Sequence, residues 1–371
     1  MKVRVGLLGC GAVAQIMHLP FLRELDTLFD IVAVADAHEE TLDAVASHYG
    51  IPVRSRDLDG LLDAAVDAVM ILTPGSHAEA AIAAMRSGRH VFVEKPLAYT
   101  PREIDAIETA ATAAGTVLQV GYMKRYDPAY RRGAELARSL ADLRFVQITT
   151  LHPTSELFWS HIPIRRGRHE SPTRSYAPYP RAIRVGDPSM HTSTELNLLR
   201  EFIGFATDDA GYATAKVILT SLCHDVNALR GVLGEPTDVL ACDATHDGGC
   251  IHTLFAFGSN LRCAYSFLYL PEPRDYREEL AFYGGNARVR IVFPSPFLRN
   301  MPTELFVSRT DDGAAAETRL IVSYEEAFKE ELRAFHHNVT TGTRPETDLA
   351  DARADLVVMS RMARLAATPA R

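Results

Sequence analysis

The sequence predicts two domains: an α/β domain on a doubly wound parallel sheet, then an α+β domain with an open, mostly antiparallel sheet. The chain has 371 residues, and domains usually run to roughly 100 to 200. Up to residue 124, short apolar segments alternate with helix-like ones. Beyond it, long segments rich in aromatic and β-branched residues follow one another. We therefore assign residues 1–124 to the first domain and 125–371 to the second, with an insertion at about 152–210.

In the first domain, the apolar segments show little alternation, which is typical of strands buried on both faces of a parallel sheet. Strands are expected at residues 3–8, 29–36, 67–74, 90–96 and 117–123. Helices are expected between them, at residues 12–25, 39–50, 77–88 and 101–115. Strands that alternate with helices over short connections predict a parallel sheet covered by helices.

The second domain is expected to contain longer strands that succeed one another, which favours antiparallel pairing. These strands are expected at residues 144–153, 250–258, 261–270, 279–293 and 303–308. Helices are expected at residues 193–205, 211–233, 324–338 and 349–365. Thr192 and Glu195 have the spacing of a capping box at the start of the first of these helices.

Charge and cysteine usage exclude several classes of protein. The net charge is −8 and the pI about 6.0, so no overall positive field attracts nucleic acid or anionic membrane. Five scattered cysteines without a C-x-x-C pair indicate neither a disulfide framework nor a zinc site. No stretch of about 18 apolar residues suits a membrane span. We expect a cytoplasmic protein without a metal and without a nucleic-acid or membrane partner.

A glycine turn, "GLLGCGAVAQ", follows the first expected strand. Gly9 permits the tight turn, Gly11 lets the backbone approach a pyrophosphate, and Ala14 lets helix and strand pack closely. Free N–H groups at the helix start bind phosphates. We therefore predict a dinucleotide-binding Rossmann domain, with the phosphate site at Gly9, Cys10, Gly11, Ala12 and Val13. The alternative is a glycine turn in an α/β protein that binds no nucleotide.

An acidic residue, Asp36, ends the second expected strand, where a carboxylate accepts hydrogen bonds from a ribose 2′-hydroxyl. A carboxylate also repels the 2′-phosphate of NADP, so Asp36 favours NAD. Ala37 and His38 provide no arginine to offset that repulsion. His38 is nevertheless able to meet a phosphate, so NADP stays open.

Two further turns are expected at the carboxyl ends of strands, where doubly wound sheets bind ligands. The third strand ends in Thr73-Pro74, with His77 at the start of the next helix, and the fourth ends in Glu94-Lys95-Pro96. We assign Thr73, Pro74, His77, Glu94 and Lys95 to the cofactor site. Lys95, at the tip of so apolar a strand, is expected to face a ligand. The alternative is a lysine on the surface.

Five motifs, in this order, resemble the glucose–fructose oxidoreductase / inositol dehydrogenase / rhizopine-catabolism (Gfo/Idh/MocA) family. They are "GLLGCGAVA", "TPGSHAEAA", "VEKPLA", "LQVGYMKRYDPAY" and "HDVNALRGVLGEP". The resemblance implies a nicotinamide cofactor, polyol or sugar-like substrates, and dimers or tetramers built through the second sheet. It also implies that Lys95 reaches the substrate beside the nicotinamide and that the Lys95–Pro96 bond is often cis.

The family pairs that lysine with a D-x-x-x-H element, and His224 stands in place of its histidine. Four residues earlier stands Thr220, which can orient a ring by hydrogen bonding but supplies no charge. Lys216, Thr220, His224 and Asn227 are expected to share a helix face, with Asp225 about 100° from His224. The predicted catalytic residues are Lys95, His224 and Thr220. The predicted substrate-binding residues are Lys95, Tyr122, Arg125, Thr220 and His224.

The expected activity is NAD(P)-dependent hydride transfer at a secondary alcohol or carbonyl, with His224 as proton relay. Lys95 or Tyr122 is able to take that role instead. Two other classes remain open because Thr220 replaces the acid. One is a lyase or hydrolase with permanently held NAD. The other is a cofactor-binding protein without turnover, which would leave Lys95 and His224 without a role.

An arginine-rich segment precedes the helix at 193–205. Its arginines are Arg165, Arg166, Arg168, Arg174, Arg181 and Arg184, with Tyr176 and Tyr179 nearby. One hypothesis is that it covers the site and binds an anionic substrate through bidentate contacts. The alternative is an exposed arm or a subunit contact.

Overall fold

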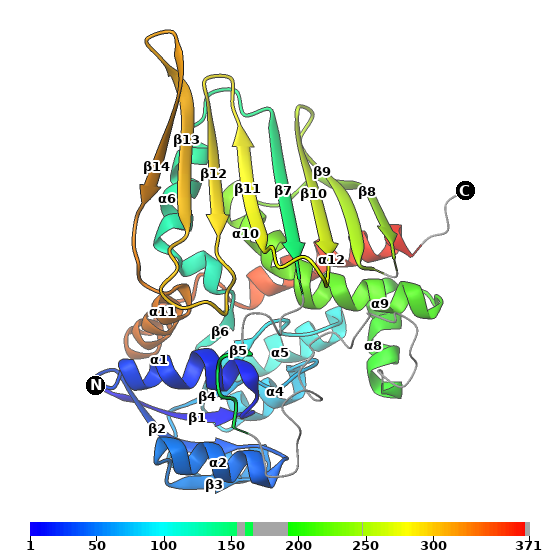
Figure 1. Ribbon diagram of the computed structural model, residues 1–371. Helices are drawn as coiled ribbons and strands as arrows, with labels where there is room; N and C mark the ends of the chain where they lie inside the picture. The colour runs from blue at the N-terminus through cyan, green and yellow to red at the C-terminus, as the bar shows by residue number, and fades with distance from the viewer. Residues whose placement is uncertain (154–159, 166–191, 247, 368–371) are drawn as a thin grey trace. The chain divides into compact units, whose positions relative to one another are not determined.

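The computed structural model describes residues 1–153, 160–165, 192–246 and 248–367. They form two compact units (Figure 1). The first unit contains residues 1–123, 160–165 and 328–353, and the second contains the other described residues. The boundary at Met123 lies beside the predicted one, but the sequence placed 328–353 in the second domain.

The sheet of the first unit has six parallel strands in the order β3-β2-β1-β4-β5-β6. The strands are β1 (Val3–Leu8), β2 (Phe29–Ala35), β3 (Val53–Ser55), β4 (Ala68–Ile71), β5 (His90–Glu94) and β6 (Leu118–Gly121). The helices between them are η1 (Ala14–His18), α1 (Leu19–Glu24), α2 (Glu39–Tyr49), α3 (Leu58–Leu62), α4 (Ala78–Arg86) and α5 (Pro101–Ala114). This is the predicted doubly wound sheet, and its strand order reverses between β1 and β4.

Local chemistry sets the element boundaries of the first unit. All four residues of β4 and of β6 are buried, as the apolar runs predicted. Thr100 and Glu103 form a capping box at the start of α5, and Gly115 closes that helix with φ 64°. The elements β3 and α3 were not predicted. Val53–Ser55 spans three residues, none of them buried, so it has no hydrophobic pattern.

Helix α11 (Ala327–Thr341) completes the first unit, although it comes more than 200 residues after β6. The ring of Phe328 packs edge-on against His18, and Phe335 against Phe92 of β5. These contacts bury an apolar stripe of α11 within the first unit, which explains the assignment of 328–353.

The edge strand β6 also depends on this late segment. The Val120 amide donates to the Thr347 carbonyl at 2.8 Å, and the Thr347 hydroxyl donates to the Val120 carbonyl. The Gln119 side chain donates to the Glu331 carbonyl at 3.0 Å. Backbone groups on the open side of β6 are thereby satisfied, which a buried edge requires.

The sheet of the second unit has eight strands in the order β14-β13-β12-β11-β7-β10-β9-β8. They are β7 (Phe145–His152), β8 (Asp238–Thr245), β9 (Cys250–Phe257), β10 (Leu261–Tyr269), β11 (Arg277–Tyr283), β12 (Ala287–Phe293), β13 (Glu304–Asp311) and β14 (Ala314–Ile321). Strands β7 and β10 run parallel, and all other neighbours are antiparallel. The predicted mostly antiparallel sheet is confirmed.

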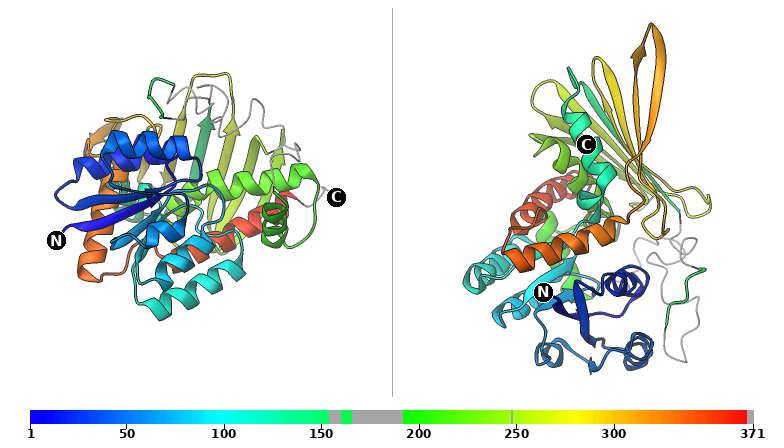
Figure 2. Two further views of the ribbon diagram at one scale, coloured as in Figure 1. Left: turned by 90° about the horizontal axis from the view of Figure 1, so that it is seen from below. Right: turned by 90° about the vertical axis from the view of Figure 1, so that its left-hand side faces the viewer.

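Helices of the second unit cover one face of this sheet. Its helices are η2 (Met123–Tyr126, which begins at the boundary), α6 (Pro128–Arg138), α8 (Ser193–Ile203), α9 (Asp209–Val217), η4 (Ile218–Leu222), α10 (Cys223–Leu233) and, from residue 354 on, α12 (Leu349–Ala366). In the right-hand view of Figure 2, α6 and α10 lie on the same side of the strands. The opposite face carries no helix of the described residues.

Two strands, one turn and helix α6 of the second unit were not predicted from the sequence. The segment 279–293, expected as one strand, is the hairpin of β11 and β12, turned at residues 284–286. The sequence there is Gly-Gly-Asn, which is typical of a turn. Strands β8 and β14 were missed because exposed polar and small residues dominate them.

Glu331 provides a test of the packing of α11. Its side chain is fully buried, neither carboxyl oxygen has a hydrogen-bond partner, and burial together with the Glu94 charge raises its pKa well above the ordinary value. Below the ordinary pKa of a glutamic acid, the side chain is neutral in both the folded and the unfolded protein, and its contribution to stability is at its maximum. The free energy of unfolding falls by about 1.4 kcal/mol per pH unit as the pH rises toward the raised pKa.

We expect Glu331→Gln, which cannot ionise, to gain stability over the wild type progressively as the pH rises. Urea unfolding at several pH values measures this difference. Glu330→Gln is the matched control, because Glu330 is half-buried and pairs with Arg333. A stability difference that does not change with pH would contradict the assignment of a neutral buried acid.

Candidate cofactor site and active site

The glycine turn after β1 has the geometry of a close backbone approach. Gly9 has φ +100°, and a Cβ on it would come within 3.0 Å of the Leu72 carbonyl carbon. A side chain would therefore be strained by both conformation and space. The Gly9 amide donates to Ala35 at the end of β2, at 2.8 Å. The turn thus leaves β1 at the edge where the other parallel strands also end.

Asp36 holds this turn from the end of β2. Its Oδ2 accepts the Cys10 amide at 2.7 Å, and its Oδ1 accepts the His38 amide at 2.8 Å. The carboxylate is thus fixed beside the glycine turn, and each oxygen keeps a lone pair for a further donor. Burial, followed by the Asp36 charge, raises the pKa of the Cys10 thiol to about 12, so the sulfur stays protonated.

Gln15 is a site residue that sequence reasoning missed. Its side-chain amide donates to the Cys10 carbonyl at 2.8 Å and to the Arg165 carbonyl at 3.0 Å. Its Oε1 accepts the Arg165 amide at 2.7 Å. The segment 160–165 is therefore fixed to the helix that follows the glycine turn. Arg165 is the one arginine of the predicted arginine-rich segment that is described. Arg166, Arg168, Arg174, Arg181, Arg184, Tyr176 and Tyr179 lie outside the described residues.

The turns after β4 and β5 are joined by His77, which is 2% exposed. Its Nε2 lies 2.5 Å from the Thr73 carbonyl oxygen, and its Nδ1 lies 2.7 Å from that of Pro96. Both ring nitrogens therefore face the protein backbone. The ring of His77 holds two turns of the site, and its contact with the cofactor stays a prediction. Pro74 stands exposed beside Thr73.

Glu94, at the end of β5, is held by His18 on the helix after the glycine turn. Its Oε1 lies 2.8 Å from His18 Nε2, and its Oε2 accepts the Lys95 amide at 3.3 Å. Burial raises the pKa of Glu94, but the His18 hydrogen bond and the Lys95 and His77 charges outweigh it and hold the pKa below its ordinary value. The Lys95–Pro96 bond is cis, as the resemblance implied. His18 was missed by sequence reasoning.

The first unit therefore brings together the predicted cofactor residues from four strand ends. Gly9, Cys10, Asp36, Thr73, Glu94 and Lys95 all lie at the carboxyl edge of its sheet. Gly11, Ala12 and Val13 follow at the helix start, whose free N–H groups suit phosphate. Tyr122 lies one residue beyond β6 and is 3% exposed.

The second unit places Thr220 inside a π-helical turn, η4, between α9 and α10. The Thr220 hydroxyl donates to the Lys216 carbonyl at 2.8 Å. A π turn inserts one extra residue into the helix. On a regular helix, His224 would lie about 80° from Lys216, and the extra residue brings the two to within about 20°. The turn thus aligns Lys216 with His224.

The same turn corrects the prediction for Asn227. The extra residue rotates Asn227 about 80° away from the face of Lys216. Asn227 is 1% exposed, and its Nδ2 donates to Asp355 at 2.7 Å. Arg125, a predicted substrate residue, donates to Asn227 at 3.4 Å. Asn227 therefore anchors α10 within the protein.

Asp225 belongs to a buried polar cluster and cannot replace the missing acid at 220, as predicted. Its Oδ1 accepts the Lys124 ammonium at 2.9 Å, and its Oδ2 accepts the hydroxyls of Thr150 at 2.9 Å and Tyr265 at 2.6 Å. Lys124 also contacts Glu278. Every Asp225 oxygen is thus engaged inside the second unit.

Lys216 has a carboxylate partner from the preceding helix. Its Nζ lies 3.0 Å from Glu195 Oε1. Thr192 caps α8 by accepting the Glu195 amide at 3.1 Å, which is half of the predicted capping box. The Glu195 side chain pairs with Lys216 instead of completing the capping box. The spacing of Thr192 and Glu195 does not indicate which of these two partners the side chain takes.

No group of three or more His, Cys, Asp and Glu residues within the described part of the chain is arranged to hold a metal ion. In the described ranges, no helix combines the length and apolar character needed to cross a membrane.

Comparison with known proteins finds a family match in the first unit. Residues 3–122 match GFO_IDH_MocA, an oxidoreductase family with an NAD-binding Rossmann fold. This match to the N-terminal part of the chain confirms the resemblance and the NAD-binding Rossmann fold. Inositol 2-dehydrogenase 3 of Saccharopolyspora erythraea is 39% identical over 138 residues, which cover 37% of this chain. The chain spans 40% of the length of that relative.

Solved structures share the fold along almost the whole chain. UDP-N-acetylglucosamine 3-dehydrogenase from Acidithiobacillus ferrooxidans has a TM-score of 0.72 at 18% identity, covering 99% of this chain and 98% of that one. The 3-ketoreductase KijD10 from Actinomadura kijaniata, in complex with NADP and TDP-benzene, has the same score, identity and coverage. The Rossmann unit and the open sheet therefore belong to one shared architecture.

The Asp36 carboxylate generates a prediction on cofactor choice. Asp36→Asn keeps an oxygen acceptor for the Cys10 amide and removes the charge that would face a 2′-phosphate. Because like charges about 4 Å apart repel by roughly 1 to 4 kcal/mol, we expect the ratio of Kd for NADPH to Kd for NADH to fall by about tenfold or more. Fluorescence titration measures both constants. Asp30→Asn, at the exposed start of the same strand, is the control, and an unchanged ratio at Asp36 would exclude a role in discrimination.

Proposed function

We propose that this protein is an NAD(P)-dependent oxidoreductase that acts on a secondary alcohol or carbonyl of a sugar or polyol-like substrate. The observation that carries the proposal is the carboxyl edge of the first sheet. There, Asp36 holds the glycine turn for the dinucleotide, and the Glu94-Lys95-Pro96 turn places Lys95 at the same edge. Phosphate groups fit the free amides after Gly9, and a ribose hydroxyl fits the Asp36 carboxylate.

The proposed reaction oxidises a secondary alcohol to a ketone. The hydride leaves the carbinol carbon for the cofactor, and the hydroxyl proton passes to the protein. When bound, the nicotinamide accepts or returns the hydride. Lys95 takes the proton from the substrate oxygen, or gives it back in the reverse direction. We propose His224 as the relay for that proton. Thr220 supports the helix there, because its hydroxyl donates to the Lys216 carbonyl.

The relatives support the substrate class, and the Asp36 carboxylate supports the choice between NAD and NADP. The inositol 2-dehydrogenase supports a polyol, and the UDP-N-acetylglucosamine 3-dehydrogenase, which shares the fold, is compatible with a sugar. We propose NAD as the preferred cofactor because Asp36 is anionic and fixed. A reducing, cytoplasmic location is supported by the five cysteines, all of them free thiols.

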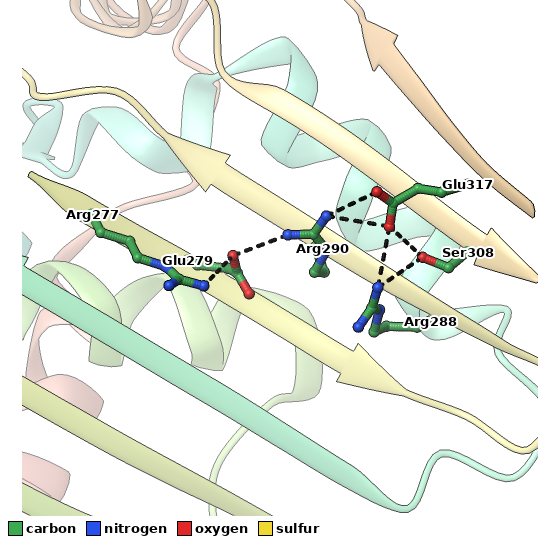
Figure 3. Close-up of polar contacts among 6 residues, drawn as sticks. All are labelled: Arg277, Glu279, Arg288, Arg290, Ser308 and Glu317. Carbon is green, nitrogen blue, oxygen red and sulfur yellow. Dashed lines mark hydrogen bonds and ion pairs between the residues drawn. The ribbon is translucent and has the colours of Figure 1, made fainter.

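We further propose that the open face of the second sheet joins copies of this chain into a dimer or tetramer. A row of alternating charges crosses that face on neighbouring strands (Figure 3). Glu279 of β11 accepts from Arg277 at 3.2 Å and from Arg290 of β12 at 3.3 Å. Glu317 of β14 accepts from Arg290 at 3.2 Å and from Arg288 at 3.1 Å. A second, oppositely oriented copy of this row places acids opposite arginines when the twofold axis passes between two neighbouring charges.

The activity is tested by following absorbance at 340 nm with NAD(H) and NADP(H) against a panel of sugars, acidic sugars and cyclitols. We expect Lys95→Ala to lower kcat by about 10²-fold or more, the usual contribution of a general acid–base. Lys329→Ala is the control, since Lys329 forms an ion pair with Glu24 away from the strand ends. Turnover retained in Lys95→Ala removes Lys95 from the mechanism. Turnover without net change at 340 nm would favour the lyase or hydrolase class.

The assembly is tested by sedimentation velocity. Arg290→Glu places a third acid between Glu279 and Glu317. Because close like charges repel, we expect the dissociation constant of the oligomer to rise by at least tenfold. Arg132→Glu, an exposed substitution on α6, is the control. A monomeric wild type, or an Arg290→Glu oligomer as stable as the wild type, would refute assembly through this face.

A further inference from the structure

His77 has an unusual pair of partners. Its Nδ1 is 2.7 Å from the Pro96 oxygen and its Nε2 is 2.5 Å from the Thr73 oxygen. Both are backbone carbonyls in turns that follow neighbouring strands, β5 and β4. The backbone of His77 adds a third link, because its amide donates to the Leu97 carbonyl at 3.2 Å. One buried ring thus bridges the two turns that the site depends on.

A carbonyl oxygen accepts hydrogen bonds and cannot donate them. Both contacts are therefore hydrogen bonds only when both ring nitrogens carry protons, and a neutral ring would leave one lone pair facing an oxygen. Burial is the largest influence on the pKa of His77 and holds it below its ordinary value, and the Lys95 charge lowers it further. The two carbonyls and the Glu94 carboxylate act in the opposite direction. Both bonds are thus complete on the acid side of the His77 pKa, and one is lost on the alkaline side.

The two turns have different tasks in the proposed function, on which this inference rests. Thr73 and Pro74 belong to the turn assigned to the cofactor, and Pro96 follows the proton-transferring Lys95. Glu94 fixes the start of the second turn through His18. At the other end of the same turn, the His77 ring contacts the Pro96 carbonyl, and the His77 amide donates to the Leu97 carbonyl. We propose that His77 is a positioning residue that holds the Lys95 turn in register with the cofactor turn.

The two bonds can be separated by substitution. The amide nitrogen of asparagine occupies about the position of Nδ1, and that of glutamine about the position of Nε2. His77→Asn therefore keeps the bond to Pro96, and His77→Gln keeps the bond to Thr73. We expect His77→Gln to lower kcat by about 10²-fold, the usual cost of a displaced reacting group. The Kd for NADH should change by less than roughly threefold. His77→Asn should retain most of kcat and weaken NADH binding instead.

Hydrogen exchange read by mass spectrometry tests the inference without a substrate. We expect His77→Gln to speed exchange in residues 94–99 and His77→Asn in residues 72–77. His90→Gln is the matched control, because His90 begins the same strand and contacts the Val117 backbone at the opposite edge of the sheet. That control should alter neither peptide.

Equal loosening of both turns by both variants, or exchange and kcat unchanged in His77→Gln, would overturn the inference. A wild type that shows no nicotinamide turnover with any substrate would refute the proposed function instead. In that case the exchange experiment still decides whether His77 joins the two turns.

Discussion

The hydrogen bond from the Cys10 amide to the Asp36 carboxylate ties the end of β1 to the end of β2, and the cofactor site depends on it. Parallel strands send all their following turns to one edge of the sheet, where backbone groups would otherwise be free to move. The first unit joins these turns in pairs. Asp36 joins the first two strands, His77 joins β4 and β5, and His18 joins the helix after β1 to Glu94.

Sequence reasoning found the parts of this arrangement that are encoded locally. Gly9, Asp36 and Lys95 each end or follow an apolar run, so strand periodicity and turn chemistry located them. The missed elements lack such signals. Val53–Ser55 has no buried residue. The hairpin between β11 and β12 interrupts a segment whose hydrophobicity continues on both sides. The π turn at Ile218–Leu222 differs from an α-helix by one residue in its hydrogen bonding, which residue type does not reveal.

Contacts between distant residues set the remaining limit. Gln15 binds the backbone of Arg165, 150 residues later, and its polarity alone gave no indication of that partner. His18 lies on the buried face of its helix, where a histidine is as compatible with packing as with pairing to Glu94. The face predicted for Asn227 assumed 3.6 residues per turn throughout. One inserted residue moved it from the side of Lys216 to a bond with Asp355.

The segment that covers the edge of the first sheet lies far along the chain, which affects the order in which the first unit can fold during synthesis. Strand β6 and the helix that closes its edge are separated by the entire second sheet, and Thr347 satisfies Val120 across that interval. Domains generally fold as they leave the ribosome, N-terminal first. Here the six strands of the first sheet emerge well before residues 328–353, which cover the edge at β6. Until Thr347 has been synthesised, the amide and carbonyl of Val120 are without the partners that they have in the folded unit.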